Sequence, residues 1–156
     1  MIKLDKLKER YPLIFPKPEE SQPFNDWGFE CGDGWYDILD AAFNTIYSSY
    51  AMAKRSYEYS ITKDTDESIT SKYKAALEKA KDDLPIIEQC KSKFGTLRLY
   101  CRNTNDRSSA AIDMAEYLSG LVCERCGSKS ATTTQGWRTT LCQPCVDKRD
   151  ERLNKQ

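Results

Sequence analysis

The chain has 156 residues, of which 39% are hydrophobic and 31% charged, and its 24 basic and 24 acidic side chains give no net charge. This composition is typical of a soluble globular protein, and without a run of 18 apolar residues the sequence predicts no membrane-spanning helix. It has no histidine, which excludes the usual general base, Ser–His and Cys–His nucleophile pairs, and zinc sites of mixed Cys and His ligands. The first ten residues lack the apolar core of a signal peptide, so we expect a cytoplasmic protein without membrane contacts.

The N-terminal third should contain one short and one long helix. Residues 3–11 have apolar side chains at near-helical spacing and predict the short one. Four prolines then predict a loop to about residue 24. Apolar side chains recur at three- and four-residue steps from Trp35 and predict a helix to about Ser60, with Asp33 as its N-cap candidate.

A second long helix should follow a charged turn at residues 63–68. Asp64 and Glu67 resemble a capping box at its start, and Pro85 ends it. The two helices predict a helical hairpin with its tip near residue 64 and an arm over residues 51–84.

The periodicity then changes to that of strands. Residues 97–102 alternate apolar and polar side chains, residues 86–91 supply a partner strand, and residues 92–95 supply the turn. Apolar positions over 111–122 predict a third main helix, which runs directly into the first cysteine pair. We therefore expect the segment that follows to pack on this helix.

Two C-x2-C pairs separated by 15 residues are the strongest motif in the chain. Both sulfurs of such a pair can reach one ion, and two pairs complete a tetrahedral shell of four thiolates around Zn²⁺. Gly127 favours a turn after the first pair, and Pro144 favours a helix that carries the second, so the order of elements is typical of a treble-clef zinc finger. Four protein ligands leave no position for water, which favours a structural site. The predicted ligands are Cys123, Cys126, Cys142 and Cys145.

Redox-active dithiols are the competing interpretation of these pairs. Without an export signal, the paired cysteines are better read as metal ligands than as disulfides. The other three, Cys31, Cys90 and Cys101, are expected to be buried as small hydrophobic side chains.

The predicted finger carries little charge with which to bind nucleic acid. Residues 121–156 contain seven basic and four acidic side chains, a formal charge of +3, which four thiolates and one Zn²⁺ reduce to about +1. We therefore favour a structural cap over direct nucleic-acid recognition by the finger.

An acidic segment and a basic strand are the other candidate surfaces. Residues 19–40 contain seven acidic and no basic side chains, with aromatic residues among them. Asp33, Asp37 and Asp40 share a helical face there and form either a solvated helix start or a patch for a basic partner. Carboxylate-based metal catalysis by Glu30, Asp33 and Asp37 is a weaker alternative.

The basic strand lies within residues 86–107, which contain five basic and two acidic side chains. Arg98, Tyr100 and Arg102 project to one face of it and could hold phosphate or stack bases. We favour the alternative that they pair with the acidic helix start, since the total charge is zero.

Three motifs in this order resemble a family of small, functionally uncharacterised proteins of bacteriophages and prophages. The motifs are Phe-Glu-Cys-Gly-Asp-Gly-Trp at 29–35, Lys-Phe-Gly-Thr-Leu-Arg-Leu-Tyr at 93–100, and Cys-Glu-Arg-Cys-Gly at 123–127 with Gly-Trp-Arg-Thr-Thr-Leu-Cys at 136–142. The match covers roughly residues 24–48 and 85–147. The resemblance implies a phage accessory role, with interference against a host or defence factor.

A weaker resemblance is to the DksA/TraR-type transcription regulators, which combine a helical hairpin with a four-cysteine treble clef. Here a β-hairpin intervenes, and the tip around Asp64 and Asp66 lacks the acidic-alanine motif of those regulators.

The sequence thus predicts an α+β protein with a mostly helical body at 1–120 and a zinc finger at 121–156 that packs on it. We expect one structural Zn²⁺ and no enzymatic activity. Contact with a host or defence protein is favoured over nucleic-acid binding, which would use Arg98, Tyr100, Arg102, Arg138 and the terminal helix.

Overall fold

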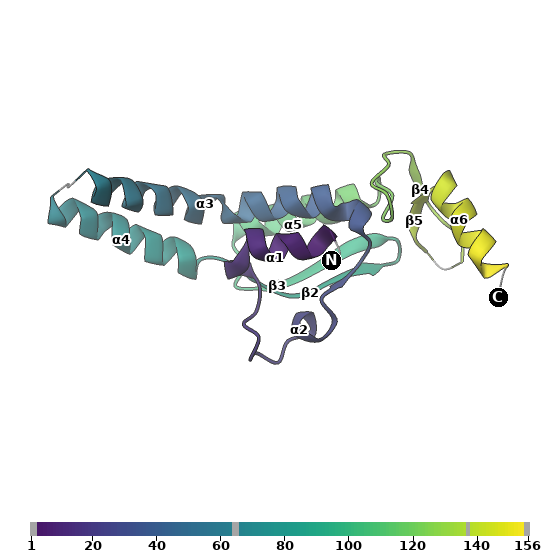
Figure 1. The fold of residues 1–156 in the computed structure, drawn as a ribbon, viewed down its shortest axis with the longest axis horizontal. Helices are drawn as coiled ribbons and strands as arrows, with labels where there is room; N and C mark the ends of the chain where they lie inside the picture. The colour runs from purple at the N-terminus through teal and green to yellow at the C-terminus, as the bar shows by residue number, and fades with distance from the viewer. Residues whose placement is uncertain (1–2, 64–65, 137, 155–156) are drawn as a thin grey trace.

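The computed structural model describes residues 3–63, 66–136 and 138–154 (Figure 1). The molecule is elongated, with a helical arm at one end, a small sheet and its helices in the middle, and the cysteine-bearing segment at the other end. In chain order the elements are the 3-10 helix η1 (Lys3–Asp5), α1 (Lys6–Arg10), the 3-10 helix η2 (Pro12–Ile14), α2 (Pro23–Trp27), β1 (Phe29–Glu30), the 3-10 helix η3 (Asp33–Trp35), α3 (Tyr36–Thr62), α4 (Glu67–Asp82), β2 (Ile86–Lys93), β3 (Thr96–Arg102), α5 (Asp106–Ser119), β4 (Ala131–Thr133), β5 (Thr140–Cys142) and α6 (Gln143–Leu153).

The central sheet has the strand order β1-β2-β3. β2 and β3 are antiparallel, and β1 is a two-residue strand parallel to β2. The free edge of β3 is covered by α5, because Ser119 Oγ and Glu116 Oε1 accept hydrogen bonds from the backbone N–H groups of Leu97 and Leu99, at 2.8 and 3.0 Å. This cover leaves β3 without a long open edge for another strand to pair with.

The core lies between the sheet and the N-terminal, α3 and α5 helices. Trp35 and Phe43 are fully buried in it. Side chains alternate along β3, and along β2 on either side of a bulge between Ile87 and Gln89. One face of the two strands therefore packs on this core and the other carries polar side chains. The first half of α3 packs on the core through the members Leu39, Ala42, Phe43 and Ile46.

The second half of α3 leaves the body and pairs with α4 to form the arm (Figure 1). α4 buries no residue. Its N-cap is Asp66, whose carboxylate accepts the Ser68 N–H at 2.8 Å. The predicted cap, Asp64, lies outside the described residues, and the helix begins two residues later than that prediction required.

The fold class is confirmed: the chain is α+β, with a helical hairpin, small sheets and a C-terminal four-cysteine cluster. Three local predictions were wrong. The loop to residue 24 contains η2 and the start of α2, the strand expected to end at residue 91 continues to Lys93, and Asp33 does not cap α3. Asp33 instead accepts the backbone N–H groups of Lys3 and Leu4, both at 3.2 Å, because the first amides of η1 have no partner within the helix.

No helix among the described residues is long and apolar enough to cross a membrane.

Candidate metal centre

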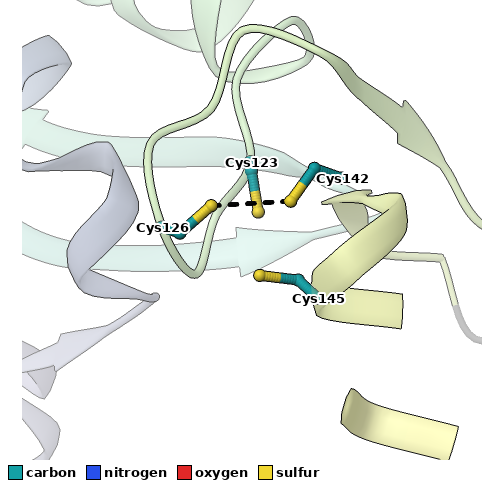
Figure 2. Close-up of side chains that lie close together, drawn as sticks. All are labelled: Cys123, Cys126, Cys142 and Cys145. Carbon is teal, nitrogen blue, oxygen red and sulfur yellow. Dashed lines mark hydrogen bonds between the residues drawn. The ribbon is translucent and has the colours of Figure 1, made fainter. Parts of the chain in front are cut away.

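The four predicted ligand atoms converge on one point (Figure 2), in the segment that lies at the opposite end of the molecule from the arm (Figure 1). All four Sγ atoms lie within 4.8 Å of one another, and those of Cys126 and Cys142 are 3.5 Å apart. A tetrahedron of Zn–S bonds of about 2.3 Å places its sulfurs about 3.8 Å apart, so the cluster is near the size that one ion requires. The donors are all soft thiol sulfurs, which suits zinc.

The first pair is carried by a tight turn after α5. The Cys123 N–H donates to Ser128 O at 2.8 Å, and the Gly127 N–H donates to Cys123 O at 2.9 Å. Gly127 has φ 79°, a left-handed conformation that glycine adopts without strain. These bonds fold the chain back on itself and turn the first two sulfurs toward the second pair.

The second pair is carried by the junction of β5 and α6. Cys142 ends β5, pairs with Ala131 across the β4–β5 hairpin and is the N-cap of α6. Cys145 lies in the first turn of α6. Pro144 lies in the same turn, where its missing N–H costs no hydrogen bond because the first N–H groups of a helix have no acceptor within it. The turn, hairpin and helix follow one another as predicted, although Trp137 of the hairpin loop lies outside the described residues.

The thiols of the cluster have opposite pKa shifts. Burial raises the pKa of Cys123, but the backbone N–H groups of Cys142, Cys126 and Arg125 outweigh it and hold that pKa at about 6. Burial and the neighbouring thiols raise the pKa of Cys145 to about 12. Crowded thiolates repel one another, so a divalent cation at the centre would stabilise all four as thiolates.

The cysteine-bearing turn contacts the body through Glu124. Its carbonyl accepts the Gly34 N–H at 2.8 Å, and its carboxylate accepts the Gly32 N–H at 3.1 Å and the Ser92 hydroxyl at 2.9 Å. Burial raises the pKa of this carboxyl. Trp35 Nε1 also donates to the carbonyl of Val122 at 2.9 Å. Sequence analysis did not identify Glu124, whose only sequence signal is its position between two cysteines. The predicted domain boundary at residue 120 stays a prediction.

Gly32 and Gly34 allow this contact because they have no side chain. A Cβ on Gly32 would lie 2.3 Å from the carbonyl oxygen of Glu124, and one on Gly34 would lie 2.2 Å from that of Cys123. The sequence signal for this contact is the pair of glycines on either side of Asp33. These glycines let the chain approach the cysteine-bearing turn closely and do not mark the start of a capped helix.

The three predicted acidic contact residues do not form one site. Asp33 caps η1. Asp40 accepts two bonds from the Arg10 guanidinium, at 2.8 and 2.9 Å, and one from the Tyr11 hydroxyl at 2.8 Å. Asp37 is the most exposed, and its nearest cation is Lys3 Nζ at 3.7 Å. Within the described residues, the four cysteines are the one group of three or more potential ligands that converges, so no such cluster includes Glu30, Asp33 and Asp37.

The two predicted basic contact residues are engaged within the molecule. Arg98 donates to Thr96 and to the carbonyl of Leu97, and lies 3.5 Å from a Glu116 oxygen. Arg102 pairs with Glu20 of the acidic segment and lies 3.9 Å from Glu88. Neither arginine pairs with the acidic helix start as predicted: Arg102 pairs with Glu20, which precedes that helix, and Arg98 pairs with Glu116 of α5. Tyr100 is exposed.

The remaining cysteines pack in or against the core. Cys90 is fully buried, and Cys31 and Cys101 are partly buried against the same cluster. The sulfurs of Cys31 and Cys90 are 4.0 Å apart, and this contact together with burial raises the pKa of Cys90. Burial raises that of Cys101 to about 12. The predicted burial is therefore complete for Cys90 and partial for Cys31 and Cys101.

Fold and site together define an α+β protein with a C-terminal four-cysteine centre able to hold a metal ion. Comparisons with protein-family models, with curated proteins and with solved structures found no match. The resemblances to phage proteins and to DksA/TraR-type regulators therefore stay expectations from the sequence motifs.

Proposed function

We propose that the four cysteines bind one structural Zn²⁺ and that the protein acts without catalysis, by contact with another protein. The observation that carries the zinc proposal is the convergence of four sulfurs within 4.8 Å. Four thiolate ligands close the coordination shell, so the ion activates no water and serves to hold the chain.

The arm is the surface best suited to a protein partner. α4 buries none of its residues, so most of that helix faces solvent. Large apolar and aromatic side chains are exposed along both helices of the arm, namely Met52, Tyr59, Ile61, Ile69 and Tyr73. Met and Tyr are enriched at protein interfaces, where each contributes a large contact area. A host or defence protein as the target rests on the resemblance of the motifs alone.

Metal analysis tests the first part of the proposal. The purified protein should contain about one zinc per chain, and Cys126→Ser should remove it. A protein that folds and unfolds identically with and without the metal would contradict a structural role.

Affinity capture tests the second part. Tyr59→Ser with Tyr73→Ser should abolish capture of the partner protein, whereas Tyr117→Ser, at an exposed tyrosine on α5, should leave it unchanged. Recovery of nucleic acid alone by the wild-type protein would contradict the proposal.

A second candidate function, nucleic-acid binding, is favoured by one specific observation. Tyr100 on the polar face of the central sheet and Phe94 in the adjacent turn are exposed, and the lysines beside them form no ion pair with any described residue.

A further inference from the structure

The polar face of the sheet and the turn at its end present two aromatic rings, Tyr100 on β3 and Phe94 in the turn, each beside a lysine. The register pairs Gln89 with Tyr100, Lys91 with Arg98 and Lys93 with Thr96, so these side chains project from the face opposite the core. Lys91 Nζ lies 5.3 Å from the centre of the Tyr100 ring, and Lys93 Nζ lies 5.3 Å from that of Phe94. Tyr100 is 44% exposed and Phe94 is 67% exposed.

Phe94 is in an unusual backbone conformation for its residue type. It occupies the first position of the two-residue turn between β2 and β3, with φ 55°, followed by Gly95 with φ 84°. Turns of this geometry favour Asn, Asp or Gly at that position, because a bulky side chain is strained at positive φ. An exposed aromatic ring held in a strained turn serves neither the core nor the turn, which points to contact with something outside the chain.

The turn borders a pocket of about 650 Å³ between the central sheet and the cysteine-bearing segment. Lys93, Phe94 and Arg138 line it, together with Glu30 and Glu124. The two carboxylates accept hydrogen bonds from uncharged groups, Glu124 from the Gly32 N–H and the Ser92 hydroxyl and Glu30 from the Gln89 side chain at 2.9 Å. The volume is within the range of sites for small ligands or one nucleotide.

The cations of this face divide into two groups. Arg98 and Arg102 are paired with carboxylates. Among the residues that the structure describes, Lys91, Lys93 and Arg138 have neither an ion pair nor a hydrogen bond through the side chain. Lys91 and Lys93, which lie over the two rings, therefore have no carboxylate partner among the described residues, and neither has Arg138, which lines the pocket from the β4–β5 loop.

We propose that this face binds single-stranded nucleic acid, with bases stacked on Tyr100 and Phe94 and phosphates on Lys91, Lys93 and Arg138. Stacking platforms beside cations are how proteins bind single strands without reading their sequence. Gln89, opposite Tyr100, is four residues from Lys93, the residue before Phe94. The backbone positions that carry the two rings are therefore more than about 13 Å apart along the strand, and the rings can serve different bases of one nucleic-acid strand. This inference goes beyond the proposed protein contact and does not depend on the partner of the arm.

An acidic peptide is the competing ligand for these three cations. It would satisfy the cations, but it would leave the exposed rings without planar groups to stack on. The nucleic acid uses both features of the face and is the ligand favoured here.

Fluorescence anisotropy with the zinc-loaded full chain tests the proposal, using labelled 12-nucleotide single strands of DNA and RNA and a 12-residue polyglutamate peptide. With three phosphate contacts, the logarithmic salt slope should be about −2, so affinity should fall about 18-fold between 50 and 200 mM salt. Phe94→Ala should weaken binding about fivefold or more, the loss typical of one stacked base. Lys93→Ala with Arg138→Ala should reduce the slope to about −0.7.

Control variants distinguish the loss of these particular side chains from the loss of any exposed ring or positive charge. Tyr117→Ala removes an equally exposed ring from α5, and Lys129→Ala removes an exposed cation outside the pocket, so both should bind as the wild type does. Phe94→Asn removes the ring but suits the turn, and it should lose binding while the protein stays folded. Tighter binding of polyglutamate than of either oligonucleotide would overturn the proposal, as would oligonucleotide binding that Phe94→Asn and Tyr100→Ala leave unchanged, or no binding at 20 mM salt.

Discussion

Replacing Gly34 by alanine tests whether the cysteine-bearing turn is held against the body. A Cβ there would lie 2.2 Å from Cys123 O, 2.6 Å from Glu124 O and 2.6 Å from the Gly127 N atom. All three are backbone atoms of one tight turn, so none can rotate away. Gly34 does not have a positive φ, and an alanine is therefore opposed by these contacts rather than by its own backbone conformation.

The expected loss of stability has two parts. Overpacking of a close contact costs about 1–3 kcal/mol, and separation of the loop from the turn also breaks the Gly34 N–H bond to Glu124, worth about 1 kcal/mol. The free energy of unfolding should fall by about 2–4 kcal/mol, and for a chain of this size the melting temperature should fall by roughly 4–16 °C.

Thermal unfolding followed by circular dichroism measures the loss, and metal analysis shows what causes it. All four ligands belong to residues 123–145, so Gly34→Ala should retain its metal. Gly120→Ala is the matched control, because Gly120 has φ −70° and its added Cβ would lie no closer than 3.3 Å to Thr96 Cγ2. If Gly34→Ala melts with the wild type and the control, the body does not hold the turn in the way described.

Three further predictions concern the metal, an ion pair and the strained turn. Cys126→Ser should release the metal and open residues 121–146 to hydrogen exchange, because metal binding and folding are coupled; full protection without metal would contradict this. The Arg102 hydrogen bond lowers the pKa of Glu20 from its ordinary value. The stabilisation from this pair is therefore fully present above the unfolded-state pKa and is lost as pH falls through the folded-state pKa. Glu20→Gln, but not Glu19→Gln, should therefore make the free energy of unfolding less dependent on pH in the acidic range. An NMR pKa of Glu20 no lower than that of an unpaired glutamate would refute the pairing. Phe94→Asn should change the free energy of unfolding by less than about 1 kcal/mol, because relief of about 1–2 kcal/mol of backbone strain offsets the lost contacts of a ring that is mostly exposed. If urea unfolding showed a large decrease in that free energy, Phe94 would be a structural residue.

Local periodicity predicted most of the helical structure. The long helices α3 and α4 have continuous patterns of apolar residues, and their ends lie within a few residues of the predicted positions. β1 was not predicted, because two residues carry no period and the strand exists only by pairing with β2, about 60 positions later. Asp33 was assigned to the wrong helix for the same reason: its true partners, Lys3 and Leu4, are about 30 positions away.

The cysteine cluster could be predicted because its spacing is itself the signal. The charged surfaces could not, since a charge is available to a partner only when nothing within the chain neutralises it. Arg102 and Glu20 are 82 positions apart, and no pattern links them. The sequence therefore selected Arg98 and Arg102, which are paired, and passed over Phe94, whose significance depends on the sign of its φ.

The proposed nucleic-acid face depends on the metal centre through one contact. Thr140, two residues before Cys142, is fully buried, and its hydroxyl donates to the carbonyl of Gly95 in the turn that carries Phe94. Removal of the metal should release β5, and with it this support of the turn and the position of Arg138. Chelation should therefore weaken oligonucleotide binding although no metal ligand lies in the pocket, and Thr140→Val should do the same with the metal retained. Undiminished binding by both the metal-free protein and Thr140→Val would show that the turn holds Phe94 without the finger.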